Sequence, residues 1–354
     1  MLPKRLFISP LDWGLGHASR LIPLIENLKK DGHFILLGTE PKTAAFLSEI
    51  FPDLPQIPLK GYRIKYGKLN TYLKLLFQIP RLTIAIIQEH QSLKKIVKEY
   101  NINTIISDSR FGLWNKNTQN FIISHQLQIL FPPKLWFFGK LLNWTNTFLL
   151  NRFDACLIPD NKNHDFSGIL SQNKAIKNQQ FLGSLSRFSL QKESLEISQN
   201  NQLVFIFSGP EPQRSIFEDI VISQLKKTSY PALLISGQPD KNYSQQITPL
   251  IKKVSHLRDK EFAKTLKQAK CVFSRSGYSS IMDYAALNLK QIVLIPTPNQ
   301  TEQEYLANKF HKANYCFTEK QQDFSLEDSL KEVKLFKGFH SVEYPPKDEM
   351  LTIF

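Results

Sequence analysis

The chain contains little cysteine and no long apolar run. Its 354 residues include three cysteines, which lie far apart and form no C-x-x-C pair. This spacing suits neither a disulfide framework nor a cysteine zinc site, and it predicts a reducing compartment. The most apolar stretch, residues 135–150, is broken by Lys140, Asn143 and Asn146, short of the ~18 residues that span a bilayer. The opening residues lack a signal-peptide core, so we expect a cytoplasmic protein that can still touch a membrane surface.

Glycine and proline are also too few for a fibrous or low-complexity chain, at 14 and 20 residues. Hydrophobic residues make up 42% of the sequence and aromatic residues 12%, enough for well-packed cores. A disordered chain is therefore excluded. The length predicts about two or three globular domains.

Acidic residues are scarce in one part of the N-terminal half. The whole chain carries a formal charge of +14, and residues 60–100 alone hold nine Lys and Arg against two Glu. Within residues 62–87 these bases alternate with Tyr, Leu, Phe and Ile. The pattern indicates either an ordinary amphipathic helix pair with a solvated basic face or a segment attracted to an anionic membrane surface. No nucleic-acid-binding motif accompanies the bases, so we expect no nucleic acid partner.

Short apolar runs alternate with amphipathic stretches in two similar series. We expect an α/β protein with two Rossmann-like, doubly wound domains facing an interdomain cleft. The predicted division is residues 1–160 for the N-terminal domain, 161–200 for a linker and crossover, 201–340 for the C-terminal domain and 341–354 for a tail. The predicted strands are 6–9, 34–37, 104–107, 121–124, 154–159, 203–207, 232–236, 271–274 and 292–295; the predicted helices are 17–30, 41–50, 215–227, 259–269, 279–287 and 302–312.

A glycine-containing turn follows the first predicted strand. It contains Gly14 and Gly16, which let the backbone approach a bound group, and His17 at the start of a helix. The third glycine of a dinucleotide-binding fingerprint is replaced by Ser19. His17 stands where a general base would meet a substrate, although a histidine that caps the helix start explains the pattern as well.

Two strand ends in the C-terminal half carry polar turns. In the first, Ser279 and Ser280 open a helix and suit a phosphate, and Asp283 could accept hydrogen bonds from a ribose diol. The second, residues 296–305, is rich in amide and carboxylate side chains, which suit hydroxyl-rich ligands such as sugars. Taken singly, serine helix caps and a polar surface loop account for the two patterns.

Together these two segments resemble the nucleotide-sugar half of GT-B glycosyltransferases of family 28, in the MurG-like group of UDP-N-acetylglucosamine transferases. The shared pattern is an R-S-G turn, small residues at a helix start, an acid on that helix, an apolar strand ending in proline and a helix with Gln-Gln/Glu-Tyr. Here it runs from Arg275 to Tyr305. Weaker matches are Gly14-x-Gly16-His17, Ser124-His125-Gln126, Arg187 at the crossover and Ser208-Gly209.

The resemblance implies an inverting, metal-independent transfer of an N-acetylhexosamine or hexose from a UDP-sugar to a lipid-linked or other hydroxyl acceptor at the cytosolic membrane face. The UDP-sugar is a co-substrate, and no cofactor is implied. His17 would deprotonate the acceptor hydroxyl, with Asp108 and Asp12 as reserve candidates for the base or for orienting His17. On the donor side, the diphosphate would meet Ser279, Ser280 and the backbone near Gly277, the ribose Asp283, and the sugar hydroxyls Gln303 and Glu304. The remaining predicted substrate-binding residues are Gly14, Gly16, His125, Arg187, Ser208, Gly209, Arg275, Ser276, Thr297 and Gln300.

Other functions fit part of the same evidence. A nucleotide-sugar hydrolase of this fold would use His17 to activate water. A non-catalytic binder of nucleotide-sugars or nucleic acid would keep the basic surface without needing His17. A nucleotide-sugar 2-epimerase is disfavoured, because no clustered carboxylates are available to abstract and return a proton.

Overall fold

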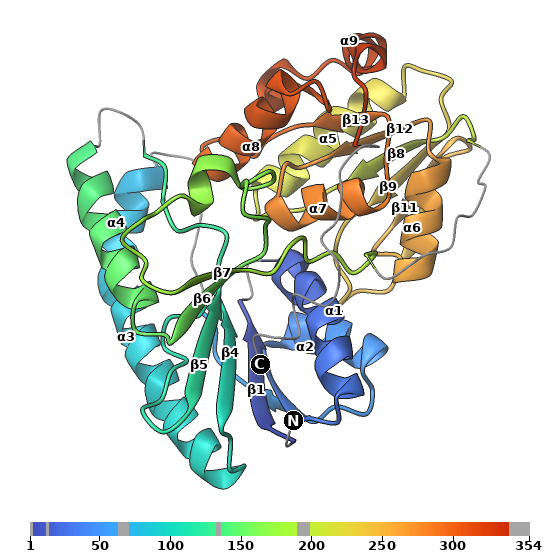
Figure 1. The fold of residues 1–354 in the computed structure, drawn as a ribbon. Helices are drawn as coiled ribbons and strands as arrows, with labels where there is room; N and C mark the ends of the chain where they lie inside the picture. The colour runs from blue at the N-terminus through green and yellow to red at the C-terminus, as the bar shows by residue number, and fades with distance from the viewer. Residues whose placement is uncertain (1–2, 12–13, 63–70, 132–135, 190–198, 340–354) are drawn as a thin grey trace. The chain divides into compact units, whose positions relative to one another are not determined.

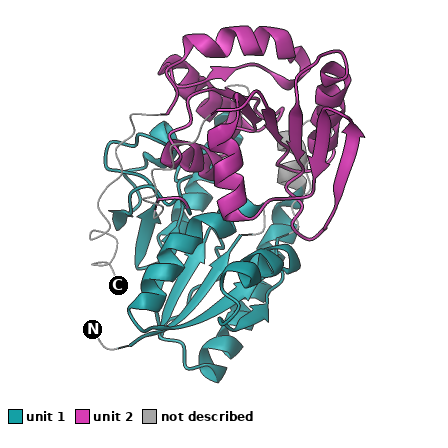
Figure 2. Cartoon of the chain, turned by 90° about the vertical axis from the view of Figure 1, so that its right-hand side faces the viewer, with its two compact units in different colours: residues 1–187, 344–354 teal, residues 188–343 magenta. Residues whose placement is uncertain are grey.

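The computed structural model describes residues 3–11, 14–62, 71–131, 136–189 and 199–339. The chain forms two compact units, Met1–Arg187 with Tyr344–Phe354 and Phe188–Glu343 (Figure 2). We call them unit 1 and unit 2 and describe each by itself. Both are α/β domains, as predicted (Figure 1).

Unit 1 contains a seven-stranded parallel sheet in the order β3-β2-β1-β4-β5-β6-β7. Its central strands are buried along nearly their whole length, because helices cover both faces of a parallel sheet. The strands are β1 (Arg5–Pro10), β2 (Phe34–Thr39), β3 (Gln56–Pro58), β4 (Thr104–Asp108), β5 (Gln119–Ile123), β6 (Ala155–Ile158) and β7 (Gln179–Phe181).

Helices lie on both sides of this sheet. They are α1 (Leu15–Lys30), α2 (Pro41–Ile50), α3 (Thr71–Glu99) and α4 (Trp136–Leu150). Figure 1 shows α3 and α4 on the opposite side of the sheet from α1 and α2. This follows from right-handed crossovers, since strands are added in one direction from β1 to β3 and in the other from β4 onward. Among the described residues, no helix has the length and apolar character needed to cross a membrane.

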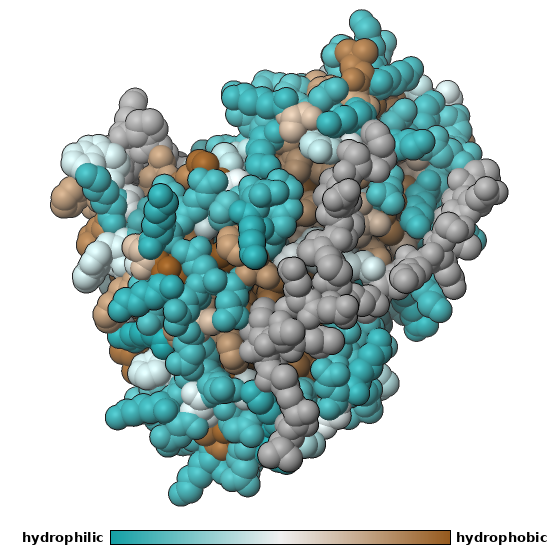
Figure 3. Space-filling view, viewed as in Figure 1, coloured by the Kyte–Doolittle hydropathy of each residue, from teal (hydrophilic) through white to brown (hydrophobic). Residues whose placement is uncertain are grey.

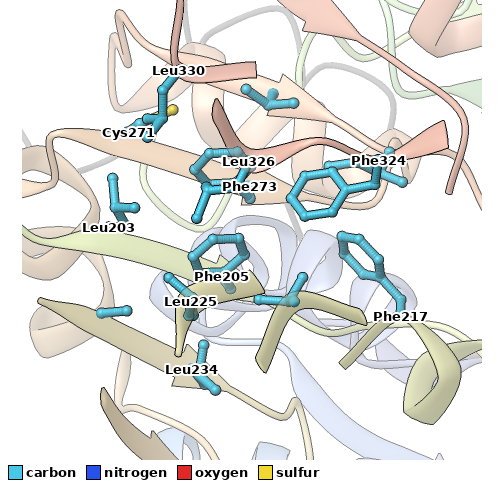
Figure 4. Packing of buried hydrophobic residues seen from close by; sticks show 14 of the residues in the cluster. Leu203, Phe205, Phe217, Leu225, Leu234, Cys271, Phe273, Phe324, Leu326 and Leu330 are labelled. Atoms are coloured by element: carbon cyan, nitrogen blue, oxygen red, sulfur yellow. The ribbon is translucent and has the colours of Figure 1, made fainter. Parts of the chain in front are cut away.

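Unit 2 contains a second sheet, in the order β10-β11-β9-β8-β12-β13-β14, parallel except for β10. Its strands are β8 (Leu203–Ile206), β9 (Ala232–Ile235), β10 (Ser244–Thr248), β11 (Ile251–Val254), β12 (Cys271–Ser274), β13 (Ile292–Leu294) and β14 (Phe317–Thr318). Its helices are α5 (Gln213–Leu225), α6 (Asp259–Gln268), α7 (Tyr278–Ala286), α8 (Thr301–Lys312) and α9 (Leu326–Glu332). In the core, the rings of Phe205 and Phe273 stack with centroids 4.4 Å apart (Figure 4).

The two sheets share a topological feature that positions ligands. In unit 1 the chain moves outward from β1 to β3 and then restarts at β4, on the other side of β1. In unit 2 the same reversal falls between β8 and β12. Ligands of such sheets bind beyond the carboxyl ends of the strands at this switch point.

The polar stretch after residue 160 differs from its expected role as a linker. Residues 168–171 form a 3-10 turn and β7 extends the sheet of unit 1, so the unit boundary falls after Arg187. The buried Asp160 carboxylate accepts hydrogen bonds from the backbone N–H groups of Phe166 and Ser167, at 3.2 and 2.7 Å. Polar side chains here satisfy the backbone of a folded loop. Residues 190–198 and 340–354 of the predicted linker and tail lie outside the described residues.

Candidate active site

His17 and Asp108 meet at the switch point of unit 1. His17 lies in the first turn of α1, directly after β1, and Asp108 is the last residue of β4. Their strands are neighbours, with Pro10 paired to Asp108. His17 Nδ1 lies 3.0 Å from Asp108 Oδ1; the Asp108 side chain is fully buried, whereas that of His17 keeps 17% exposure. A partly exposed imidazole backed by a buried carboxylate is suited to act as a general base.

Arg20, one turn further along α1, completes the cluster. Its Nε donates to Asp108 Oδ2 at 2.7 Å, and its Nη2 donates to Asp108 Oδ1. Its Nη1 lies 3.0 Å from Nδ1 of His125, which follows β5 and is 7% exposed. A two-pronged contact between guanidinium and carboxylate fixes both groups. The structure thus joins the three predicted residues His17, Asp108 and His125 with a fourth, Arg20, which the sequence analysis did not predict.

The charges in this cluster shift the pKa values of both members of the pair. Burial alone raises the pKa of the Asp108 carboxyl, but the charges of Arg20 and His17 and their hydrogen bonds hold it well below its usual range. Desolvation lowers the pKa of His17, Asp108 raises it, Arg20 and His125 lower it, and the net result is below the ordinary value. Near pH 7 Asp108 is therefore ionised and His17 is neutral and able to accept a proton.

A second buried ion pair holds the loop that follows Asp108. Arg110 Nε donates to Glu89 Oε1 at 2.6 Å, and the Tyr62 hydroxyl donates to Glu89 Oε2 at 2.7 Å. Ser109, which lies between Asp108 and Arg110, has a φ of 58°. The sequence analysis missed this cluster. Its one available signal was Glu89 itself, the first acidic residue after a stretch, residues 60–88, that contains none.

The glycine turn leaves the start of α1 without a side-chain cap. Gly14 is the N-cap residue, is exposed and has a φ of 126°, a conformation that side chains other than hydrogen disfavour. The Gly16 carbonyl accepts a hydrogen bond from Ser19 Oγ at 3.1 Å. Because the first backbone N–H groups of a helix are unpaired within it, this end can bind a polar ligand beside His17. The reserve candidate Asp12 lies outside the described residues.

Helix α7 begins at the switch point of unit 2. Its N-cap residue is Gly277, which has no side chain to cap the helix. Half-buried Ser279 and Ser280 lie in the first turn. Asp283, one turn further, is 6% exposed. Hydroxyl and backbone N–H donors at a helix N-terminus suit a diphosphate, and its binding to these residues stays a prediction.

Arg275 and Ser276, predicted to bind substrate, are committed to the fold. The Arg275 guanidinium is 1% exposed and donates from Nη2 to Gln213 O at 2.9 Å and to Gln321 Oε1 at 2.6 Å. Ser276 is fully buried, and its hydroxyl donates to Gln303 O at 2.8 Å. Desolvation lowers the pKa of Arg275 to about 9. The R-S-G turn therefore connects the end of β12 to neighbouring segments by hydrogen bonds. Its buried side chains support the fold around the candidate site.

The amide-rich loop after β13 is held by its own side chains. Gln303 Oε1 accepts from Thr297 N at 2.9 Å, and Gln303 Nε2 donates to Gln300 Oε1 at 2.6 Å. Glu304 Oε1 accepts from Asn299 N at 3.0 Å. These predicted sugar-binding residues thus organise the loop in the structure, and contacts of theirs with a sugar remain a prediction.

Two further predicted residues, Gly209 and Thr297, lie close together in unit 2. Gly209, directly after Ser208, has a φ of 97°, and a Cβ built on it would lie 3.5 Å from Thr297 Oγ1. That hydroxyl is buried and has no hydrogen-bond partner among the described residues. The loops after β8 and β13 are therefore close together. Arg187 belongs to unit 1, where its guanidinium lies 5.9 Å from the ring centroid of Phe46.

In the described part of the chain, no group of three or more His, Cys, Asp or Glu side chains could hold a metal ion.

Comparisons with known proteins agree with the observed fold. The fold is similar to that of the glycosyltransferase of kitacinnamycin, with a TM-score of 0.63 and 12% identity over 94% of this chain and 91% of that one. It is also similar to Acinetobacter baumannii MurG, with a TM-score of 0.57 and 10% identity over 99% and 95% of the two chains. Two Rossmann-like units with this topology define the GT-B class of glycosyltransferases, and this chain has that fold.

Sequence relatives indicate which glycosyltransferases this chain resembles. Residues 203–344 match the glycosyltransferase family 28 C-terminal domain. The UDP-N-acetylglucosamine–N-acetylmuramyl-(pentapeptide) pyrophosphoryl-undecaprenol N-acetylglucosamine transferase of Lactobacillus johnsonii is 24% identical over 318 residues, 83% of this chain and 79% of that protein. The Lactobacillus acidophilus protein of the same name is 24% identical over 324 residues. The chain is therefore a glycosyltransferase that is similar to MurG and whose residues 203–344 match the family 28 C-terminal domain, which confirms the predicted resemblance.

Proposed function

We propose that this protein transfers a sugar from a UDP-sugar to a hydroxyl of a lipid-linked acceptor, by direct displacement with inversion and without a metal ion. The observation that carries the proposal is the 3.0 Å contact between the partly exposed His17 imidazole and the buried Asp108 carboxylate at the switch point of unit 1, where the surroundings lower the pKa of both groups. The family 28 domain in unit 2 supplies the donor side. The names of the curated relatives, which contain a UDP-N-acetylglucosamine donor and a pyrophosphoryl-undecaprenol acceptor, support this choice of substrates.

In the proposed step, His17 Nε2 takes the proton of the acceptor hydroxyl. The hydroxyl oxygen forms a bond to the anomeric carbon of the sugar while the bond from that carbon to the diphosphate oxygen breaks. The electron pair of the broken bond leaves with UDP, and attack from the opposite face inverts the anomeric configuration. Asp108 orients His17 and stabilises the imidazolium that forms.

The start of α7 is assigned to the leaving diphosphate. Backbone N–H groups near Gly277 and the hydroxyls of Ser279 and Ser280 can stabilise the charge that develops on the diphosphate. Asp283 is assigned to the ribose hydroxyls. The Thr297 hydroxyl, which has no partner within the described segments, is a further donor close to the Gly209 loop.

The test is a transfer assay with UDP-N-acetylglucosamine and UDP-glucose as donors and undecaprenyl-linked saccharide as acceptor, with and without EDTA. We expect His17→Gln to lower kcat by about 10²- to 10⁴-fold and to leave UDP binding intact. His33→Gln is the matched control, because His33 precedes β2 at the amino end of the same sheet. Release of free sugar by the wild type without transfer would favour the hydrolase, and UDP binding without turnover would favour a non-catalytic binder.

We also propose that unit 1 docks on a membrane, through α4. Trp136, Phe137, Leu141, Trp144 and Phe148 are each at least half exposed, between 50 and 68%. Positions 137, 141, 144 and 148 follow the spacing of one helix face. Pale and brown side chains gather along the edge of unit 1 where Figure 1 labels α4 (Figure 3).

The opposite face of α4 faces the protein and carries two asparagines beside the buried Gly139 and Leu150. Asn143 accepts from Ile129 N at 2.7 Å and donates to Ile129 O at 2.9 Å, and the buried Asn146 donates to Leu127 O at 3.2 Å. A helix of a water-exposed domain normally turns its apolar face inward. On α4 the outward face is instead the more apolar one, as expected for a helix whose outer face meets an apolar phase.

The charge of this region suits an anionic lipid surface. No acidic residue occurs between Asp108 and Asp154, a stretch with three lysines and, besides the buried Arg110, one further arginine. Lys140 lies on α4 itself, with its Nζ 4.8 Å from the Trp136 ring centroid. Residues 60–100, the membrane-contact segment predicted from the sequence, contribute the exposed Ile79, Ile84 and Ile87 of α3. The proposed membrane surface therefore includes α4 in addition to this segment. Aromatic and basic residues together favour binding at a lipid interface.

Vesicle sedimentation tests this surface. We expect the protein to bind phosphatidylglycerol-containing vesicles more tightly than phosphatidylcholine vesicles. The double variant Trp144→Ser, Phe148→Ser should weaken binding at least about 10²-fold, since each inserted side chain contributes about 1.5 kcal/mol or more. Leu335→Ser is the control, because Leu335 is 71% exposed in unit 2. Equal binding of the double variant and the wild type would contradict the proposal.

A further inference from the structure

A single guanidinium contacts three titratable side chains in unit 1. Arg20 donates to both carboxylate oxygens of Asp108, its Nη1 lies 3.0 Å from His125 Nδ1, and its Nη2 lies 3.0 Å from His17 Nδ1. The guanidinium is 1% exposed. The three partners come from separate elements, namely the end of β4, the loop after β5 and the first turn of α1.

The contact with Arg20 determines the protonation of His125. A guanidinium is always charged and has only donors. The hydrogen bond therefore requires a lone pair on His125 Nδ1. A neutral imidazole with its lone pair on Nδ1 carries its proton on Nε2. His125 consequently presents an N–H donor from the far side of its ring.

The contact with Asp108 determines the opposite arrangement in His17. His17 Nδ1 lies 3.0 Å from Asp108 Oδ1, and an ionised carboxylate can only accept. A lone pair on Nδ1 would face the lone pairs of that oxygen. Arg20 Nη2 already donates to Asp108, so it does not need His17 as an acceptor. The proton therefore lies on Nδ1, and Nε2 carries the lone pair.

We infer that Arg20 is a positioning residue that fixes opposite tautomers in the two histidines, through Asp108 for His17 and directly for His125. This inference deepens the proposed function and rests on His17 as the base. In this arrangement Nε2 carries the lone pair in His17 and the proton in His125.

Histidine-selective ¹⁵N labelling with long-range ¹H–¹⁵N correlation spectra reads the tautomer of each ring in the full chain. The eight histidines are assigned by the loss of signals in His17→Asn and His125→Asn. In the wild type near pH 8 we expect the proton on Nδ1 of His17 and on Nε2 of His125. Finding both rings in the same tautomer, or His17 protonated at Nε2, would overturn the inference.

Two substitutions test whether Arg20 is the cause. Arg20→Lys keeps the charge but cannot reach all three partners, so we expect His125 to become a mixture of tautomers and kcat to fall by at least about tenfold. Arg20→Gln also removes a charge that lowers the His17 pKa, so the acid limb of the pH–kcat profile should move to higher pH. Unchanged tautomers in a folded Arg20→Lys and an unchanged acid limb in a folded Arg20→Gln would reduce Arg20 to a structural residue.

The spectra do not depend on turnover. If no transferase activity is found but the two tautomers are opposite and change in Arg20→Lys, the positioning role stands and the proposed function fails. If transfer depends on His17 but the tautomers are equal, the proposed function stands and this inference fails.

Discussion

The substitution Asp108→Asn tests the catalytic pair and the stability of unit 1 together. In the wild type, the Asp108 carboxylate accepts hydrogen bonds from Arg20 Nε at 2.7 Å, from Arg20 Nη2, from His17 Nδ1 at 3.0 Å and from Ser109 Oγ at 3.2 Å. An amide has one oxygen and one NH₂ group in place of the two oxygens, so it turns a donor toward at least one buried donor. It also leaves the buried Arg20 charge without its partner.

Both effects are large because Arg20 and Asp108 are buried. Loss of one partner from a buried ion pair costs about 3–5 kcal/mol. A neutral amide no longer requires the proton on His17 Nδ1, and the wrong tautomer at such a pair costs up to ~10⁴-fold in kcat. We therefore expect Asp108→Asn to lower the free energy of unfolding of unit 1 by about 3–5 kcal/mol and to reduce kcat by about 10²- to 10⁴-fold.

Urea unfolding followed by tryptophan fluorescence measures the first effect. All four tryptophans, Trp13, Trp114, Trp136 and Trp144, belong to unit 1, so the signal reports that unit. The folded-state pKa of Asp108 is depressed, so its contribution to stability is present above the ordinary carboxyl pKa and is lost as pH falls toward the folded value. The difference between variant and wild type should therefore be full near pH 7 and smaller near pH 3. A variant as stable and as active as the wild type would refute the reasoning.

Four further outcomes follow from the structure. The kcat of the wild type should fall on the acid side with a pKa below the ordinary histidine value, because burial lowers the pKa of His17; a limb above that value in the pH–rate profile would contradict this. Arg275→Met should destabilise unit 2 by several kcal/mol in calorimetric melting, whereas Ser279→Ala should leave melting unchanged and weaken UDP binding by about tenfold. Gly209→Ala should cost about 1–2 kcal/mol through its φ of 97°, measured by urea unfolding. Cys156, whose pKa burial raises to about 12, should resist iodoacetamide in the native protein and react in urea, as counted by mass spectrometry.

The sequence predicts the fold well where a segment is buried in a regular way. Strands such as β1 and β4 are apolar along their length because both faces of a parallel sheet are covered, and the predicted strands of both units are confirmed. The segment from 161 to 187 was misassigned because its polar side chains bond to their own loop, which composition alone cannot distinguish from a linker. Helix α4 was missed because its apolar face points outward.

The candidate site was predictable in its residue types but only partly in its contacts. His17 and Asp108 each stand at a strand end, and the sheet order, which the sequence does not state, makes those strands neighbours. Arg20 was missed because a basic residue one helical turn after the histidine also fits a solvated helix face. Arg275 was taken for a ligand contact because a sequence motif does not show whether a side chain points outward or is buried under its turn.

Calorimetric titration with UDP and UDP-N-acetylglucosamine tests the central claim most directly, on the full-length wild type, Asp283→Ala and His17→Gln. The account predicts that the wild type binds both ligands, that Asp283→Ala weakens both by about tenfold or more, and that His17→Gln binds them as the wild type does. The absence of binding of either ligand to the folded wild type would contradict the account.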